Sequence, residues 1–154
     1  MPRLIEPVPN ISEGRRPEVV EAAVAALKRT TGLRVLDVQS DADHNRSVLT
    51  LAGDEAALRE RLLALYGVAV QRIDLRQHQG EHPRMGAVDV VPVHPDRGRD
   101  HGRLRRAGAE RRPRPSAERY GVPVFLYEEA ATAPHRRNLE DIRRGEFEGL
   151  RRGR

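Results

Sequence analysis

Two stripes of apolar residues at helical spacing constrain the fold of this chain more than any other sequence feature. The first lies between Pro17, which suits the first turn of a helix, and Gly32, which can follow the end of one. The second begins after Asp54, a good helix-capping residue. The stripes consist of Val20, Val24 and Leu27 and then of Leu58, Leu62, Leu65 and Ala69. Two such helices need an apolar surface to cover, which favours a sheet beneath them.

The segments around these helices have the pattern of β-strands. Residues 4–9 indicate an edge strand, because prolines cannot donate to a central ladder, and residues 10–14 indicate a turn. The other predicted elements are strands at 35–38, 48–52, 88–93 and 122–127, a polar loop at 40–46 and a short helix from residue 138. This order predicts an α+β fold, a ferredoxin-like two-layer sandwich with a mixed β-sheet and its helices packed on one face.

Composition places the chain among globular proteins. Apolar residues make up 38% of it and 13 glycines add to this, which is typical of folded domains. No run approaches the roughly 18 apolar residues of a membrane span, and the absence of cysteine excludes disulfides and thiolate metal sites. We therefore expect a cytoplasmic domain that has no membrane partner.

The positive charge is concentrated in one window. The net charge is +5, yet nine of the arginines lie in residues 97–119 with three acidic residues, so the rest of the chain is nearly neutral. Aromatic residues make up only 3% of the chain and none is Trp, which leaves few platforms for stacking on bases. Nucleic acid is therefore not an expected partner.

The Arg-rich window at 97–116 does not fit the predicted fold. A crossover helix is expected there, but the segment has few apolar residues and two prolines, which is typical of a solvated basic loop. A sharper hypothesis is a pair of compensating frameshifts near residues 98 and 115. With GC-rich codons chosen for Arg99 to Pro115, the frame that starts one base later reads VTMADCVALARSADPA, which has an apolar face at helical spacing.

A chain that carries this string in place of residues 99–115 is expected to melt at a higher temperature than the chain as written. Three or four additional buried apolar side chains would contribute about 1.5–3 kcal/mol each. Thermal unfolding of the two chains measures the difference, and equal melting temperatures would contradict the frameshift hypothesis.

The densest polar cluster is the segment 78–86, with the sequence HQGEHPRMG. Its glycines and proline favour a loop, and loops on a rigid sheet commonly present reactive groups. A histidine there can pass a proton either way near neutral pH. The letters also match the H-x-x-E-H zinc pattern, but that pattern needs a helix, which Gly80 and Pro83 disfavour, so no metal is expected. A surface loop with incidental histidines is the plain alternative.

Two weaker clusters precede this one, at residues 10–14 and 41–46. Each alone is typical of a turn, because Asp and Asn side chains bond to their own backbone. Asp41 and Asp43 have a spacing that calcium sites use, but the remaining ligands are missing.

Together, however, the motifs VPNxSEG, DxDHNRSV, HxGEHPRMGAxDVxP, GVPVFLYEEA and RRGEFEGL resemble the N-terminal subdomain of glutamate formimidoyltransferase. The resemblance covers residues 2–96 and 117–152, and the HPRMGAVDVVP run is its most specific part. It implies transfer of a formimino group from N-formimino-L-glutamate to N5 of tetrahydrofolate, in histidine degradation. Tetrahydrofolate is then the co-substrate, and no metal is implied.

The resemblance also assigns roles to single residues. His82 matches the catalytic histidine, which relays the proton that the folate nitrogen loses, and Arg46 or Arg84 could clamp a glutamate carboxylate. The positions implied to contact substrate or folate are Asn10, Glu13, Asn45, Arg46, His78, Glu81, Arg84 and Gly86. The chain departs from the family pattern at Gln39, where some members carry an acidic residue.

The family's transferase has a second subdomain that contributes much of the folate site. Residues 1–154 are therefore expected to form one domain, the N-terminal half of the enzyme, inactive alone because the C-terminal subdomain or a companion chain is absent. The alternative is a non-catalytic, stand-alone subdomain that binds a partner chain carrying the missing half. A homodimer is compatible with both interpretations.

Overall fold

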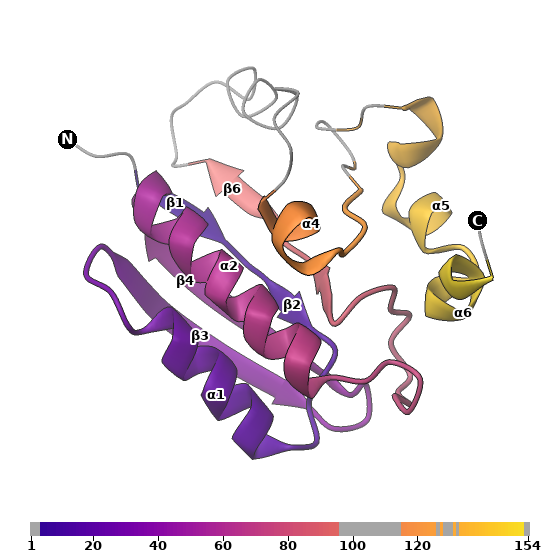
Figure 1. Cartoon of the computed structure of the whole chain (residues 1–154), viewed down its shortest axis with the longest axis horizontal. Coiled ribbons are helices and arrows are strands. Elements are labelled where there is room, and N and C mark those ends of the chain that lie inside the picture. The colour runs from indigo at the N-terminus through magenta and orange to yellow at the C-terminus, as the bar shows by residue number, and fades with distance from the viewer. Residues whose placement is uncertain (1–3, 96–114, 126, 128–130, 132, 153–154) are drawn as a thin grey trace.

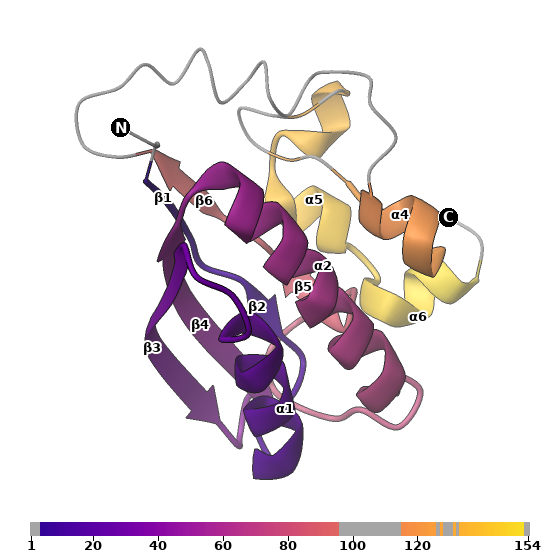
Figure 2. The same cartoon turned by 60° about the vertical axis from the view of Figure 1, so that its left-hand side comes forward.

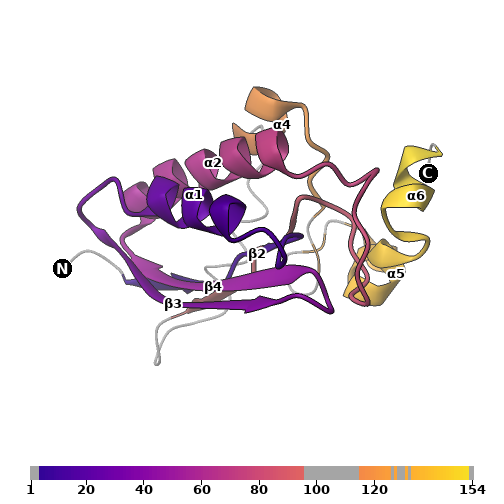
Figure 3. The same cartoon turned by 90° about the horizontal axis from the view of Figure 1, so that it is seen from below.

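The computed structural model describes residues 4–95, 115–125, 127, 131 and 133–152 (Figure 1). These residues form an α+β fold in which helices cover one face of an antiparallel sheet (Figure 3). The strands are β1 (Ile5–Pro7), β2 (Asn10–Ile11), β3 (Leu33–Asp41), β4 (Arg46–Gly53), β5 (Val88–Val90) and β6 (Val93–Pro95). The helices are α1 (Pro17–Leu27), α2 (Glu55–Arg72), α4 (Pro115–Tyr120), α5 (Leu139–Arg143) and α6 (Glu146–Arg151), with a 3-10 turn η2 (Pro134–Arg136).

Strand β4 is the centre of the sheet. On one side, β4 pairs with β3 along its whole length, and on its other side it pairs with β2 and with β1. The strand order is therefore β5-β2-β4-β1-β6, with β3 beside β4. All the pairings in the described residues are antiparallel, so the predicted mixed sheet is wrong for this part of the chain. A hairpin joins β3 to β4, while β2 follows β1 after two residues and β6 follows β5 after two residues.

The two long predicted helices are confirmed, and the short helix predicted from residue 138 is α5. Pro17 occupies the first turn of α1, and the Asp54 side chain accepts a 2.9 Å hydrogen bond from the backbone nitrogen of Ala57 at the start of α2. The predicted stripes face the sheet, where Leu27 and Leu65 are completely buried against the inner face of β4. Burial alternates along β4, as expected for a strand with one covered face.

Three predicted segments differ from the structure. The turn at 10–14 begins with strand β2, because Asn10 and Ile11 pair with both β4 and β5. The strand at 88–93 is divided into β5 and β6 at Pro92, which has no N–H to continue a ladder. Residues 122–125 and 127 form no strand, since Pro123 removes another ladder donor.

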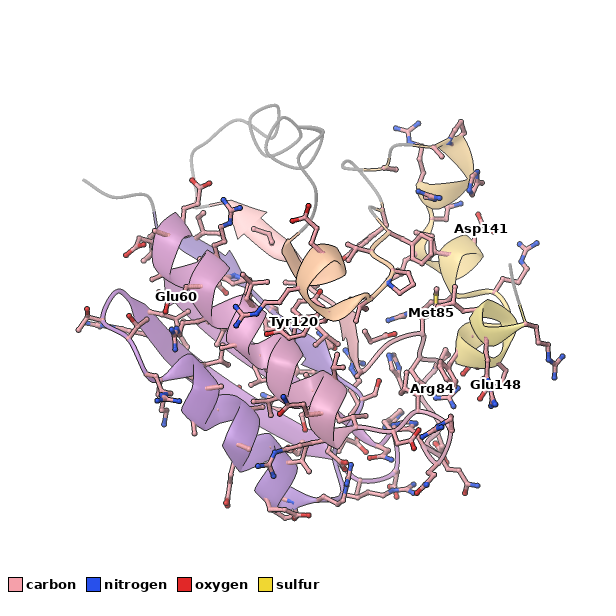
Figure 4. All side chains as sticks on the ribbon, viewed as in Figure 1. Glu60, Arg84, Met85, Tyr120, Asp141 and Glu148 are labelled. Carbon is pink, nitrogen blue, oxygen red and sulfur yellow. The ribbon has the colours of Figure 1, made fainter. Side chains whose placement is uncertain are left out.

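The segment after the Arg-rich window packs on the second helix. Residues 97–114 of the window lie outside the described residues, so the frameshift hypothesis remains a prediction. Tyr120 of α4 donates to the carbonyl of Leu63 over a distance of 2.9 Å (Figure 4). Its hydroxyl lies 2.8 Å from where a Cβ at Gly67 would stand, so a larger residue at position 67 would displace α4.

The last two helices lie beside the connection between α2 and β5. Figures 1 and 2 show α5 and α6 on the same side of the molecule as that connection. The backbone nitrogen of Phe147 donates to the carbonyl of Arg84 over 3.0 Å, which joins α6 to it directly. Within the described ranges, no helix is both long and apolar enough to span a bilayer.

Candidate functional site

The three polar clusters predicted from the sequence meet at one end of the sheet, and Asn45 joins them. Its Oδ1 accepts a hydrogen bond from the nitrogen of Gly14, and its Nδ2 donates to the carbonyl of Gln79, both at 2.9 Å. Asn45 has a φ of +49°, a left-handed conformation that Asn tolerates better than most residues. The sequence therefore brings residues 10–14, 41–46 and 78–86 into one site.

Close backbone contacts explain why these clusters contain glycine at positions 14 and 80. A Cβ on Gly14 would stand 2.2 Å from the carbonyl oxygen of Asp41, and one on Gly80 would stand 2.4 Å from that of His44. Gly86 contributes its carbonyl, which accepts a 2.8 Å hydrogen bond from the Ser12 hydroxyl. The glycines let the three segments approach each other at backbone distance.

His82 lies within this site, and its side chain is 19% exposed. Its Nε2 is buried and has no hydrogen-bond partner among the described residues; the nearest carboxylate oxygen, Oδ2 of Asp89, is 4.0 Å away. Burial lowers the pKa of His82, and the guanidinium groups of Arg46 and Arg143 lower it further, against the opposing effect of Asp89. The imidazole is therefore a free base at neutral pH and can accept a proton.

Asp89 is a site residue that the sequence analysis did not single out. Its side chain is only 3% exposed, and Oδ1 accepts hydrogen bonds from the backbone nitrogens of Met85 and Gly86. Its Oδ2 accepts a 2.5 Å hydrogen bond from Arg143 of α5. The available signal was a carboxylate in the middle of an apolar strand, a position where an ionised group is costly unless it is paired.

Arg46 is the predicted carboxylate clamp that remains available. Its guanidinium donates from Nε and Nη2 to Oδ1 of Asn10, a neutral partner. In the described part of the chain no carboxylate forms an ion pair with it. Asn10 is buried and therefore fixes the direction in which the guanidinium points. A charged fork with a neutral anchor suits a carboxylate that comes from a ligand.

Arg84, the other predicted clamp, is already occupied. Its guanidinium forms ion pairs with Glu146 at 3.0 Å and with Glu148 at 2.8 Å, both on α6, and its side chain is 9% exposed. Figure 4 shows Arg84 beside Glu148. The structure thus gives Arg84 the role of joining α6 to the 78–86 loop. A substrate carboxylate would have to displace two glutamates to bind there.

His78 is held by this same arginine. Its Nε2 lies 3.0 Å from the carbonyl of Asn45, and its Nδ1 accepts a hydrogen bond of 3.1 Å from Nε of Arg84. Since a carbonyl only accepts, Nε2 carries the proton and the ring is neutral. Both ring nitrogens are engaged, so His78 positions the loop.

The two predicted glutamates have different surroundings. Glu13 is buried, and its carboxylate accepts hydrogen bonds from the backbone nitrogens of Arg15 and Arg16 and from the Arg16 side chain, which fixes the approach to α1. Burial raises the pKa of Glu13, but these hydrogen bonds outweigh it, and the net pKa lies below its ordinary value. Glu81 is exposed and contributes a 3.1 Å backbone hydrogen bond to the carbonyl of Asp43.

Residues 4–154 match the family described as "Formiminotransferase domain, N-terminal subdomain". The chain belongs to this family. It is 42% identical over 153 residues to the glutamate formimidoyltransferase of Streptococcus pyogenes serotype M1, covering 97% of this chain and 50% of that protein. It is 43% identical to the formimidoyltransferase-cyclodeaminase of Rattus norvegicus, covering 97% of this chain and 28% of that one.

An archaeal relative gives the same result. The glutamate formimidoyltransferase of Thermoplasma acidophilum is 38% identical over 145 residues, which is 94% of this chain and 48% of that protein. This formiminotransferase subdomain thus spans about half the length of these two transferases and a smaller share of the bifunctional one. The family resemblance found in the sequence motifs is confirmed.

The charges around His82 favour an anionic ligand in this formiminotransferase subdomain. Two guanidinium groups, of Arg46 and Arg143, act on the imidazole against the single carboxylate of Asp89. No group of three or more His, Cys, Asp or Glu that could hold a metal ion occurs in the described ranges. The site can therefore accept a proton and attract negative charge with its own side chains.

Glu148 is expected to release Arg84 in acid. The hydrogen bond from Arg84 lowers the pKa of Glu148 from 4.5 to about 2. Because the folded-state pKa is the lower one, the pair stabilises the folded chain above pH 4.5 and loses this effect as the pH falls through about 2. An NMR titration of the Glu148 carboxyl carbon measures the midpoint. In an Arg84→Met chain the midpoint of Glu148 should return towards 4.5. If the unaltered chain has the same midpoint as Arg84→Met, the pairing of Glu148 with Arg84 is contradicted.

Proposed function

We propose that this chain is the N-terminal half of an enzyme that transfers a formimino group from N-formimino-L-glutamate to tetrahydrofolate. The observation that carries the proposal is the buried Nε2 of His82, which has no hydrogen-bond partner among the described residues, in an imidazole held as a free base. It is supported by relatives that are named glutamate formimidoyltransferases and match 94–97% of this chain. The reaction would belong to histidine degradation, and the expected cytoplasmic location remains a prediction.

The proposed chemistry needs one proton relay. N5 of tetrahydrofolate attacks the formimino carbon, and a tetrahedral intermediate forms as that nitrogen loses its proton. His82 accepts this proton and returns it to the nitrogen of glutamate, whose bond to the carbon then breaks. The products are 5-formiminotetrahydrofolate and glutamate. A group with a pKa near or below neutrality can perform both transfers.

The other predicted residues fall into two groups. Arg46 and Asn10 are proposed to bind a carboxylate of the substrate, because in the described part of the chain this arginine donates to the neutral amide of Asn10 and forms no ion pair. Asn45, His78, Arg84 and Gly86 are proposed to hold the loops that surround the ligands, which is supported by their hydrogen bonds to residues of those loops. Glu13 is proposed to hold the approach to α1. Glu81 is exposed and is the remaining candidate for direct contact.

We propose that a second half, on the same chain or on a partner chain, completes the site. A ferredoxin-like two-layer sandwich remains our interpretation of the helices on one sheet face, and the open face would meet the partner. In the alternative, the domain has no turnover of its own and binds a chain that carries the missing half. The relatives of about twice its length favour the first interpretation.

A chimaeric protein tests the proposed function. Residues 1–154 would replace the matching half of the Streptococcus pyogenes relative, and formation of 5-formiminotetrahydrofolate would be followed by mass spectrometry. Transfer is expected with N-formimino-L-glutamate, and its loss in the same chimaera with His82→Asn links it to this chain. A chimaera that folds, binds folate and shows no transfer would contradict the proposal.

A further inference from the structure

Helix α5 reaches the candidate site from the other end of the chain. Arg143, near its end, places Nη2 at 2.5 Å from Oδ2 of Asp89. Both side chains are largely covered, with exposed fractions of 18% for Arg143 and 3% for Asp89. A pair this shielded from water is screened less by solvent and salt than an exposed surface pair. It therefore fixes where the Asp89 carboxylate stands.

The two oxygens of Asp89 have separate tasks. Oδ1 accepts the backbone nitrogens of Met85 and Gly86, which determines the shape of the loop after His82. Oδ2 is bound by Arg143 and lies 4.0 Å from Nε2 of His82, too far for a hydrogen bond. That imidazole nitrogen has no other partner in the described residues. The guanidinium thus holds the oxygen that the imidazole would otherwise bind.

We propose that Arg143 is a positioning residue of the site. By holding Oδ2 of Asp89, it keeps this carboxylate from closing on Nε2 of His82 and so determines how tightly the imidazole binds a proton. This inference rests on the proposed function of His82 as the proton relay. A base that paired fully with Asp89 would have a higher pKa and would return its proton less readily.

The charged groups that face His82 come from four elements. Arg46 lies on β4, Asp89 on β5 and Arg143 on α5, and the ring of His44, in the β3–β4 connection, has its centroid 6.4 Å from that of His82. Removal of Arg143 would leave one guanidinium, that of Arg46, and one carboxylate, that of Asp89, acting on the imidazole of His82. It would also free Asp89 to approach the imidazole, so both consequences act in the same direction.

The test is an NMR titration of the six histidines in the 154-residue chain, with the His82 signals assigned from a His82→Asn sample. In Arg143→Gln, the pKa of His82 should rise by about one unit, the usual effect of an opposite charge that comes within reach. The matched control is Arg144→Gln, because the neighbouring Arg144 pairs, within the described residues, with Asp141 of α5 at 2.8 Å. That control should leave the pKa of His82 unchanged, and Arg143→Lys should lie between wild type and Arg143→Gln.

A second pair of variants tests whether Arg143 acts through the carboxylate. In an Asp89→Asn background, Arg143→Gln should move the pKa of His82 by less than it does in the unaltered chain. An unchanged pKa in Arg143→Gln, or equal shifts in Arg143→Gln and Arg144→Gln, would overturn the inference. The inference would also be overturned if Arg143→Gln unfolds while Arg144→Gln stays folded, because the Arg143–Asp89 pair would then be a structural contact. The readout needs no catalysis, so failure of this inference can be distinguished from failure of the proposed function.

Discussion

Replacing His82 with Asn is expected to slow formimino transfer by about 10²–10⁴-fold while leaving the fold nearly intact. This is the usual contribution of a positioned acid–base group. The side chain is partly exposed and its Nε2 has no hydrogen bond to lose among the described residues, so the change removes chemistry and little structure. Single-turnover kinetics of the chimaera with the second half of the Streptococcus pyogenes relative measures the effect, and thermal unfolding checks the fold.

His78→Asn is the matched control for this experiment, because it makes the same change four residues earlier in the same loop. Both nitrogens of His78 are engaged, one with Asn45 and one with Arg84, so this ring holds the loop and carries no proton between substrates. Its replacement should lower activity less and stability more than His82→Asn does. Equal losses of activity in the two variants would contradict this division of roles.

The helices could be predicted from the sequence because their information is local. Apolar spacing, a proline in the first turn and an Asp54 cap determine α1 and α2 wherever the rest of the chain goes. The strand at 122–127 looked equally clear by composition, but a strand also needs a neighbour, and Pro123 weakens its ladder. The same limit applies to the turn at 10–14, whose first residues become β2 only because β4 and β5 flank them.

The residues of the candidate site also divide into those that the sequence indicates and those that only the fold brings together. The motif residues near His82 could be found because they are adjacent in the sequence, and the family pattern names them. Asp89 falls within a predicted strand and Arg143 within the short helix predicted from residue 138, and no motif marks either as a site residue. Their 2.5 Å contact joins residues 54 positions apart, which no periodicity can indicate. Arg84 shows the converse, since a good clamp in isolation is already bound by Glu146 and Glu148.

The chain produced as residues 1–154 alone is expected to bind tetrahydrofolate weakly and to show no measurable transfer. A ligand of this size is normally buried over about 70–90% of its surface, commonly in a cleft between domains. The described residues offer one wall, built from the segments 10–14, 41–46 and 78–86 at one end of the sheet. With a single wall, the folate ring stays hydrated and its N5 has no fixed distance to His82, so proximity contributes little to the rate.

Isothermal titration calorimetry of tetrahydrofolate into this chain measures the binding directly. Adding the second half of the Streptococcus pyogenes relative as a separate chain should then restore both binding and transfer, provided that the open face of the sheet is intact. Addition of that second half with His82→Asn in the first should restore binding but only a small part of the transfer, since the wall is then complete and the base is missing. Tight stoichiometric binding by residues 1–154, or turnover without a partner, would mean that these loops form a whole site by themselves.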